Sequence, residues 1–177
     1  DILIEDNPPR ILEELKLTYQ DLSKLNPGLI VTSITPFGQT GPYRDYRAYP
    51  LNTYHSSGMG YLSPMVSDAK VPLKPGRFFS ECACGLVAAG GTLGALYHQR
   101  VTGLGQQVDI SKQEALLNLV RVQVDRYPFE GLVQSRVDTR KGSLGMVACK
   151  DGYISQAGAQ PHEWRALIRL LAGSEME

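Results

Sequence analysis

One carboxylate, Glu81, opens the part of the sequence that carries the fewest charges. It is the only acidic residue between Asp68 and Asp109, and small and apolar residues follow it as far as Tyr97. An ionised carboxylate is costly to desolvate unless it lies at a favourable electrostatic position, such as the first turn of a helix. We expect Ser80 to be the N-cap of such a helix, which would favour the charged form of Glu81. The alternative is that Glu81 is an ordinary helix-start acid, since Asp and Glu are common in first turns.

A second group of residues combines arginines with tyrosines. Arg44, Tyr46, Arg47 and Tyr49 follow a stretch rich in glycine and proline, residues 35–42. Arginine suits a phosphate, and tyrosine suits an adenine or an acyl face. These side chains could therefore line the mouth of a pocket, or they could belong to an ordinary solvated loop.

The cysteines favour neither a metal site nor a disulfide framework. Cys82 and Cys84 form a single C-x-C pair with no second pair and no adjacent histidine, so we expect no zinc site and no other metal. The cysteine count is three, an odd number that suits a reducing cytoplasm.

Composition limits the classes of function. The chain has 177 residues, 42% of them hydrophobic, which is enough for one domain or a large piece of one. Its 18 basic and 18 acidic residues cancel, so no global field favours nucleic acid or an anionic membrane as a partner. No uninterrupted apolar run reaches the length of a membrane span. Because the chain begins without methionine, we expect it to be part of a longer, soluble protein.

The order of the predicted elements indicates an α/β fold. Two β-type runs, residues 2–5 and 29–34, flank a polar, helix-prone stretch, which predicts a β-α-β unit with parallel strands. Residues 35–42 hold two prolines and two glycines and are predicted to form a loop at the end of the second strand. In open α/β sheets, ligands bind at such strand ends.

The middle of the chain predicts more helix and one more strand. Residues 51–62 have loosely helical spacing, and a proline-rich connector, 63–76, leads to a helix over 80–99. That helix is rich in glycine, which predicts close approach of neighbouring backbones. A strand is expected over 106–110, and Ser111 is expected to cap another amphipathic helix, which has apolar residues at Ala115, Leu116, Leu119, Val120 and Val122.

The last part of the chain predicts a separate small unit. Residues 128–145 lack any hydrophobic period, which favours a long loop or linker. A hairpin is expected over 146–156, because Asp151 and Gly152 form a typical hairpin turn, and a helix is expected over 160–172.

Six blocks of sequence stand out, in chain order: DILIEDNPP from Asp1, YQDLSKLNPGLIVTSI from Tyr19, FGQTGPY from Phe37, TGLGQQVDIS from Thr102, QEALLNLVR from Gln113 and CKDGYI from Cys149. Together they resemble the class III coenzyme A transferases, whose relatives include the α-methylacyl-CoA racemases. The first block is similar to the family's DVLIENFRPG.

The resemblance implies a Rossmann-like fold with helices on both faces of a parallel sheet, in an interlocked dimer of longer chains. It implies that residues 1–127 form the middle of a large domain, 128–145 a linker and 146–177 the start of a small domain. A cytoplasmic homodimer without nucleic acid or membrane partners is expected.

The resemblance also implies a chemistry. In the family, an aspartate attacks the acyl thioester of CoA, giving a mixed anhydride and then an enzyme-bound CoA thioester, from which a second carboxylic acid is acylated. That aspartate falls on Glu81, and an active-site tyrosine falls on Tyr49. Acyl-CoA and a small carboxylic acid would be the substrates, with no tightly bound cofactor. The glutamate is one methylene longer than the family's aspartate, and misplacement by about 1 Å can cost roughly a hundredfold in rate.

Four further residues would contact CoA by the same resemblance. They are Asp6 and Asn7, where the family has Asn and Phe, the apolar Leu15, and Arg47. An adjacent family arginine is Glu14 in this chain. Two alternatives stay open: a non-catalytic CoA-binding subunit of a hetero-oligomeric transferase, and a racemase or isomerase of the same fold. Racemases have a histidine at the position of Tyr49, which disfavours the last.

Overall fold

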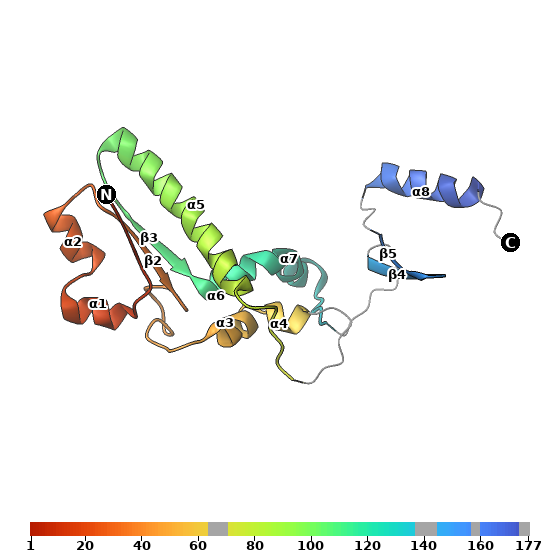
Figure 1. Ribbon diagram of the computed structural model, residues 1–177, viewed down its shortest axis with the longest axis horizontal. Coiled ribbons are helices and arrows are strands. Elements are labelled where there is room, and N and C mark those ends of the chain that lie inside the picture. The colour runs from red at the N-terminus through yellow and green to blue at the C-terminus, as the bar shows by residue number, and fades with distance from the viewer. Residues whose placement is uncertain (64–70, 137–144, 157–159, 174–177) are drawn as a thin grey trace. The chain divides into compact units, whose positions relative to one another are not determined.

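The computed structural model describes residues 1–63, 71–136, 145–156 and 160–173 (Figure 1). It divides into two compact units, Asp1–Asp138 and Thr139–Glu177. The predicted boundaries of the domains in the longer protein stay a prediction.

The first unit is built on a three-stranded parallel sheet in the order β1-β2-β3 (Figure 1). The strands are β1 (Ile2–Glu5), β2 (Ile30–Thr35) and β3 (Gln107–Ser111). Both pairings are parallel. Two short helices, α1 (Pro9–Leu15) and α2 (Tyr19–Leu25), connect β1 to β2. The predicted β-α-β unit is therefore confirmed.

The central strand β2 is buried because helices cover both faces of the sheet. On one face, the hydroxyl of Thr32 lies 2.7 Å from that of Thr92 in the long helix α5 (Phe79–Thr102). Val31 and Ser33 point to the other face, as strand alternation requires, and line a cavity there together with Leu12 of α1. The predicted α/β class, a parallel sheet between helices, is confirmed.

The start of α5 differs in detail from the sequence prediction. The helix begins at Phe79, with Phe78 as an N-cap that makes no side-chain capping bond. Ser80 lies inside the first turn and is only 6% exposed, so the prediction that it caps the helix was wrong. Position 80 is buried, so it favours a small side chain such as serine, and the serine does not cap the helix. Glu81 lies in the first turn, as predicted.

The glycines of α5 do not share one cause. A Cβ built on Gly91 would lie 2.9 Å from Cγ1 of Val108 on β3, so this glycine permits close helix–sheet packing. At Gly85, Gly90 and Gly94 a Cβ would meet no described atom within 4 Å. The predicted close approach of a neighbouring element to the helix is therefore confirmed at Gly91. Within the described chain the prediction was wrong at Gly85, Gly90 and Gly94, where no neighbouring element comes close.

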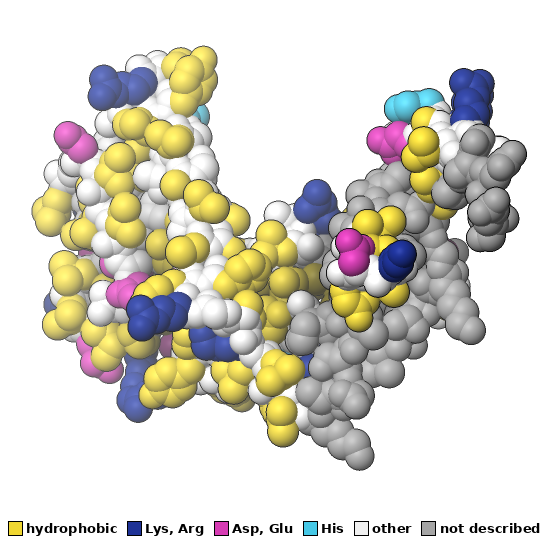
Figure 2. Space-filling view, turned by 45° about the vertical axis from the view of Figure 1, so that its right-hand side comes forward, with side chains coloured by type: hydrophobic (Ala, Val, Ile, Leu, Met, Phe, Trp, Pro, Cys, Tyr) yellow, Lys and Arg dark blue, Asp and Glu magenta, His cyan; other side chains and the backbone are white. Residues whose placement is uncertain are grey.

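The side of α5 away from the sheet is apolar and exposed. Leu86, Leu93, Tyr97 and Val101 recur along it and are 65–75% exposed. Figure 2 shows apolar side chains over much of the visible face of the first unit. By length and composition alone α5 could cross a membrane, but the core helix of a globular domain passes the same test, and α5 packs against β2 and β3.

The segment between β2 and α5 holds two short helices, α3 (Pro50–Ser56) and α4 (Met59–Leu62). Gly58, with φ of 84°, separates them. The helical prediction for residues 51–62 is confirmed. Of the predicted connector, residues 64–70 lie outside the described part of the chain.

Beyond β3 the predicted amphipathic helix is divided into three pieces. They are α6 (Lys112–Leu117), the 3₁₀ turn η1 (Asn118–Val120) and α7 (Arg121–Glu130). Ser111 is the N-cap, as predicted, and its hydroxyl accepts a hydrogen bond of 3.2 Å from the backbone N–H of Glu114. Pro128 lies within α7, so the prediction of a loop from residue 128 was wrong by about one helical turn. Residues 137–144 of that loop lie outside the described chain.

The second unit consists of a hairpin and a helix. Strands β4 (Gly145–Cys149) and β5 (Gly152–Gln156) pair antiparallel around Lys150 and Asp151. Helix α8 (Pro161–Gly173) follows. Both predicted elements are confirmed.

Candidate functional site

The carboxyl ends of the three parallel strands meet at one cavity. Asp6 follows β1, Pro36 follows β2 and Lys112 follows β3, and all three line a cavity of about 400 Å³. The segment from Arg44 to Tyr49 forms the rest of its wall, with Arg10 of α1. The predicted pocket mouth is therefore present, at the edge of the sheet where ligands bind in open α/β folds.

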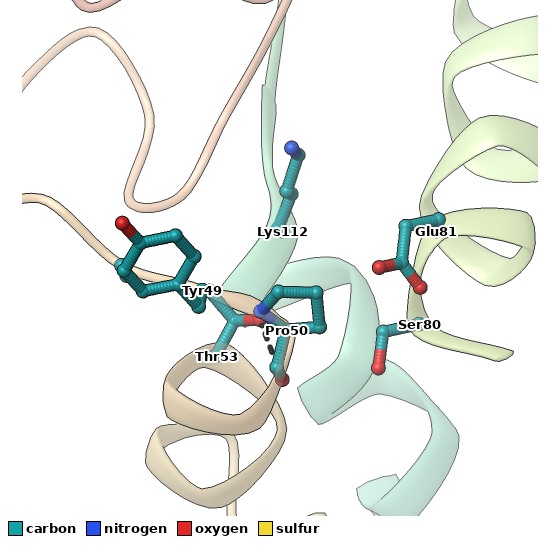
Figure 3. Close-up of a pocket in the computed structure, with 7 residues that line it drawn as sticks. Tyr49, Pro50, Thr53, Ser80, Glu81 and Lys112 are labelled. Carbon is teal, nitrogen blue, oxygen red and sulfur yellow. Dashed lines mark hydrogen bonds between the residues drawn. The ribbon is translucent and has the colours of Figure 1, made fainter. Parts of the chain in front are cut away.

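A smaller cavity of about 40 Å³ lies beside the first. Its wall includes Glu81 and Ser80 from the first turn of α5, Tyr49 and Thr53 from the start of α3, and Lys112 (Figure 3). Three elements far apart in sequence thus enclose one carboxylate. The volume suits a few water molecules or one small polar group.

Glu81 extends from α5 into this space (Figure 3). Its Oε2 atom is buried and has no hydrogen-bond partner among the described residues. Buried carboxylate oxygens normally have a partner, so an orphaned oxygen on a cavity wall indicates a place for a bound group or water. The carboxylate is thus reachable from a cavity rather than sealed behind packed neighbours.

Tyr49 and Lys112 belong to the walls of both cavities and join them. In Figure 3 the Tyr49 hydroxyl points away from Glu81, so the ring rather than the hydroxyl faces the carboxylate. The Tyr49 side chain is 76% exposed. A ligand could therefore extend from Glu81, past Tyr49 and Lys112, into the larger cavity.

The cations of the larger cavity differ in how they are held. Arg44 forms ion pairs with Glu13 and with Asp45, and its hydrogen bond to Glu13 is the main cause of the raised pKa of its guanidinium. Arg10, Arg47 and Lys112 form no ion pair within the described residues. These three cations are available to an anionic ligand.

The loop over residues 36–41 is held in place from β3 and from the start of α6. The backbone N–H of Gln39 donates a 2.9 Å hydrogen bond to Oδ2 of Asp109, and the N–H of Gln113 donates one of 3.1 Å to the carbonyl of Pro36. Gly38, with φ of 85°, allows the turn. These bonds fix the strand-end loop that carries Pro36 into the cavity.

Cys84 lies one turn after Glu81 and is 1% exposed. Burial is the main cause of the raised pKa of its thiol. The Lys112 ammonium acts against this shift, and the Glu81 carboxylate adds to it. The Cys84 thiol is thus within electrostatic reach of both charged groups on the small cavity.

The structure brings together four of the six residues expected at the site. Glu81, Tyr49, Arg47 and Asp6 line one or both cavities. The other two line neither: the backbone N–H of Asn7 bonds to Oε2 of Glu5, and Leu15 ends α1 with 61% of its surface exposed. The roles expected for all six residues stay predictions.

Sequence reasoning missed Lys112 and Arg10. A signal for Lys112 was present, since it is the first charged residue after the predicted strand 106–110 and strand ends carry ligand-binding residues. Arg10 gave no such signal, because its approach to the segment from Arg44 to Tyr49 depends on how α1 packs.

Comparison with known proteins identifies the family of the chain. The sequence pattern of CoA-transferase family III matches the chain over residues 1–177. The chain belongs to this family. The resemblance drawn from the sequence motifs is confirmed.

Two curated relatives show what family members do. The chain is 30% identical over 180 residues to the succinyl-CoA:(R)-benzylsuccinate CoA-transferase subunit BbsE of Thauera aromatica, covering 100% of this chain and 43% of the relative. It is 32% identical over 124 residues to a formyl-CoA:oxalate CoA-transferase of Streptomyces avermitilis, covering 70% of this chain and 30% of the relative. The chain thus spans less than half the length of either relative.

A solved structure supports the fold. A CAIB/BAIF family protein from Brucella suis matches with a TM-score of 0.74 and 27% identity, over 97% of this chain and 46% of that protein.

Proposed function

We propose that the complete protein transfers coenzyme A between an acyl-CoA and a free carboxylic acid, with Glu81 as the nucleophile. Family membership supports CoA transfer in general. One observation carries the specific proposal. Among the described residues, Glu81 Oε2 has no hydrogen-bond partner, and its cavity adjoins a larger one with three cations that form no ion pair there.

The first half of the reaction forms a covalent enzyme. A Glu81 carboxylate oxygen attacks the thioester carbonyl, the carbon–sulfur bond breaks, and CoA leaves as a thiolate. The product is a mixed anhydride between Glu81 and the acyl group. The CoA thiolate then attacks the glutamyl carbonyl, which releases the donor acid and leaves a glutamyl-CoA thioester.

The second half reverses these steps with the acceptor. The acceptor carboxylate attacks the glutamyl thioester carbonyl and expels the CoA thiolate, giving a second anhydride. The thiolate attacks the acceptor's acyl carbonyl, which forms the new acyl-CoA and regenerates the Glu81 carboxylate. No water enters, so exclusion of water from the small cavity would protect both anhydrides.

The surrounding residues have supporting roles in this proposal. Arg47 and Arg10 are suited to the phosphates of CoA, because guanidinium groups bind phosphate oxygens bidentately. The Tyr49 ring packs beside the thioester, between the two cavities. We further propose a cytoplasmic homodimer with no tightly bound cofactor, no metal and no nucleic acid or membrane partner.

The test is a covalent adduct on Glu81. The complete protein, incubated with succinyl-CoA, is expected to gain a hydroxylamine-sensitive adduct that peptide mass spectrometry places on Glu81. Glu81→Gln is expected to form no adduct and to lose at least about a thousandfold in transfer rate, because the nucleophile is gone. Glu81→Asp is the matched control, since it keeps a carboxylate and is expected to keep the adduct at a rate lowered by about a hundredfold.

A second candidate is a non-catalytic CoA-binding subunit. Two observations favour it: the relative BbsE is named as a subunit, and Glu81 stands where the resemblance places an aspartate. Binding of CoA without any adduct in the wild-type protein would support this candidate and contradict the first.

A racemase or isomerase of the same fold has less support. It requires a proton-transfer base beside the acyl α-carbon, and no histidine lines either of the two described cavities. Deuterium exchange into the acyl chain without a carboxylate acceptor would favour it.

A further inference from the structure

The first turn of α5 carries Glu81 but has no side-chain cap. Phe78, at the N-cap position, makes no capping bond, and the first N–H groups of a helix have no partner within the helix. The first helical hydrogen bond, of 2.8 Å, runs from the Cys82 N–H to the Phe78 carbonyl. Because helix ends fray, a contact from outside the helix is needed to hold Glu81 at its cavity.

The segment that leads into this turn, residues 71–78, is bound by a histidine. Nε2 of His55, in the last turn of α3, lies 2.9 Å from the carbonyl oxygen of Leu73. Within the described chain, this is the one hydrogen bond that joins residues 71–78 to any element other than α5, which follows them. A carbonyl oxygen only accepts, so Nε2 of His55 carries the proton.

The His55 ring is closely packed, whereas the segment that it binds is not. A Cβ built on Gly60 would collide with Cε1 and Nδ1 of the ring, and the ring of Tyr54 lies edge-on to it, with centroids 5.6 Å apart. A cavity of about 270 Å³ is lined by residues 73–75 together with Tyr54 and Ser63. The hydrogen bond, rather than tight packing, therefore joins the segment to α3.

Helix α3 also forms part of the wall of the small cavity. Thr53, in its first turn, lines the cavity that holds Glu81, and His55 lies half a turn further along the same helix. The helix is fixed to α6 by Gln113, whose side-chain amide donates a 3.0 Å hydrogen bond to the Ser56 carbonyl. A bond from α3 to the entry of α5 therefore sets how two walls of one cavity lie relative to each other.

We propose that His55 is a positioning residue, whose bond to the Leu73 carbonyl holds the first turn of α5 so that Glu81 faces the substrate. This inference rests on the proposed role of Glu81. His55 lines neither cavity of the site, so it acts through the segment 71–78 and not on the substrate. Misplacement of a reacting group by about 1 Å can cost roughly a hundredfold in rate, so loss of the bond is expected to slow the chemistry and to leave CoA binding unchanged.

Two substitutions of His55 separate its hydrogen bond from its packing. His55→Leu has no donor, whereas His55→Gln keeps an N–H at a similar reach. In the complete protein, we expect His55→Leu to lower the maximal rate of adduct formation from succinyl-CoA by about 10- to 100-fold. The concentration of succinyl-CoA that gives half of this rate is expected to stay unchanged. His55→Gln is expected to recover most of the rate, and His98→Gln, at an exposed histidine of α5, is the control that changes neither quantity.

Three kinetic results would overturn the inference. An unchanged maximal rate in His55→Leu would show that the bond does not position Glu81. Equal losses in His55→Leu and His55→Gln would show that the shape of the ring matters and its hydrogen bond does not. A change confined to the half-saturating concentration would assign His55 to CoA binding.

Hydrogen exchange tests the first turn without turnover, so it separates this inference from the proposed function. The Cys82 N–H reports on the turn because it makes the first helical hydrogen bond. We expect this amide to exchange at least about tenfold faster in His55→Leu than in the wild type or His55→Gln, with no change at the Val31 amide of β2. Faster exchange at Cys82 in a protein whose wild type forms no adduct would support the role of His55 and contradict that of Glu81.

Two exchange results would contradict the role of His55 itself. Equal exchange at Cys82 in all three proteins would show that the bond does not hold the first turn. An equal acceleration at Cys82 and Val31 would show that His55 stabilises the whole unit rather than this turn.

Discussion

At the scale of the residue, the small cavity is defined by three side chains with different physical roles. Glu81 supplies an oxygen without a hydrogen-bond partner, Lys112 supplies an unpaired positive charge, and Tyr49 supplies an apolar ring that joins two cavities. Neither the Glu81 Oε2 atom nor the Lys112 ammonium has a partner among the described residues, whereas Arg44 is paired with Glu13 and Asp45. A buried carboxylate oxygen without a partner is costly, so the small cavity is a place where a water molecule or a ligand group would bind it.

Cys84 provides a prediction on pH dependence. Because its folded pKa is raised, chiefly by burial, the thiol contributes stability that is fully present below the ordinary thiol pKa and is lost as the pH rises through the raised value. The free energy of unfolding, measured by urea titration, is expected to fall over this alkaline range in the wild-type protein. Cys84→Ala is expected to remove this part of the fall, whereas Cys82→Ala, at an exposed thiol, is not. Equal pH profiles for wild type and Cys84→Ala would contradict the burial argument.

At the scale of the element, α5 carries both Glu81, the proposed nucleophile, and the contact that positions it. Its buried side packs on β2 and β3, and this contact directs the first turn toward the carboxyl ends of the strands. The position of Glu81 therefore depends on how closely the helix can approach the sheet. Among the glycines of α5, Gly91 is the one at which an added Cβ would meet a β3 side chain.

Substitution of Gly91 tests this dependence. A Cβ at Gly91 would lie 2.9 Å from Val108, whose β-branched side chain has few rotamers available, so Gly91→Ala is expected to destabilise the protein by about 1–3 kcal/mol. Gly85→Ala is the matched control in the same helix. Its Cβ meets no described atom within 4 Å, so better helix propensity should stabilise the protein by about 0.5–1 kcal/mol.

Urea unfolding of both variants gives the comparison. The free energy of unfolding of Gly91→Ala is expected to be lower than that of Gly85→Ala, whatever the exact size of each change. The reverse order would mean that α5 does not rest on β3 as described.

At the scale of the whole molecule, the exposed apolar surface is large for an isolated protein. Leu86, Leu93, Tyr97 and Val101 lie along one side of α5, and Ile4 at the sheet edge is 63% exposed. The chain spans 43% of the relative BbsE and 46% of the Brucella suis protein, so much of a full-length family member lies outside these residues. Contiguous apolar patches of this kind mark surfaces that contact other protein segments.

The proposed homodimer gives the prediction at this scale. Light scattering on the complete protein is expected to give a mass of two chains that does not change on dilution through the micromolar range, because interfaces of obligate dimers are large and apolar. A mass of one chain would contradict the dimer. A mass of two different chains after co-expression with a related subunit would instead support the hetero-oligomeric candidate.

The sequence alone determined the α/β class, the parallel pairing of the first two strands, the family and the lone carboxylate at the start of α5. These follow from local hydrophobic periodicity, from turn residues and from motifs that keep their order, all of which act over a few residues. The Ser111 cap was predictable for the same reason, since its partner Glu114 is three residues away.

Only the tertiary structure decided which side chains share a cavity with that carboxylate. Lys112 and Tyr49 share a cavity with Glu81 because β3, α3 and α5 converge at one edge of the sheet, and no local sequence pattern predicts that convergence. The burial of Ser80, the separate roles of the α5 glycines and the distance of Leu15 from both cavities were decided in the same way. Each depends on packing between segments far apart in sequence, where side-chain volume and close approach, rather than local propensity, set the outcome.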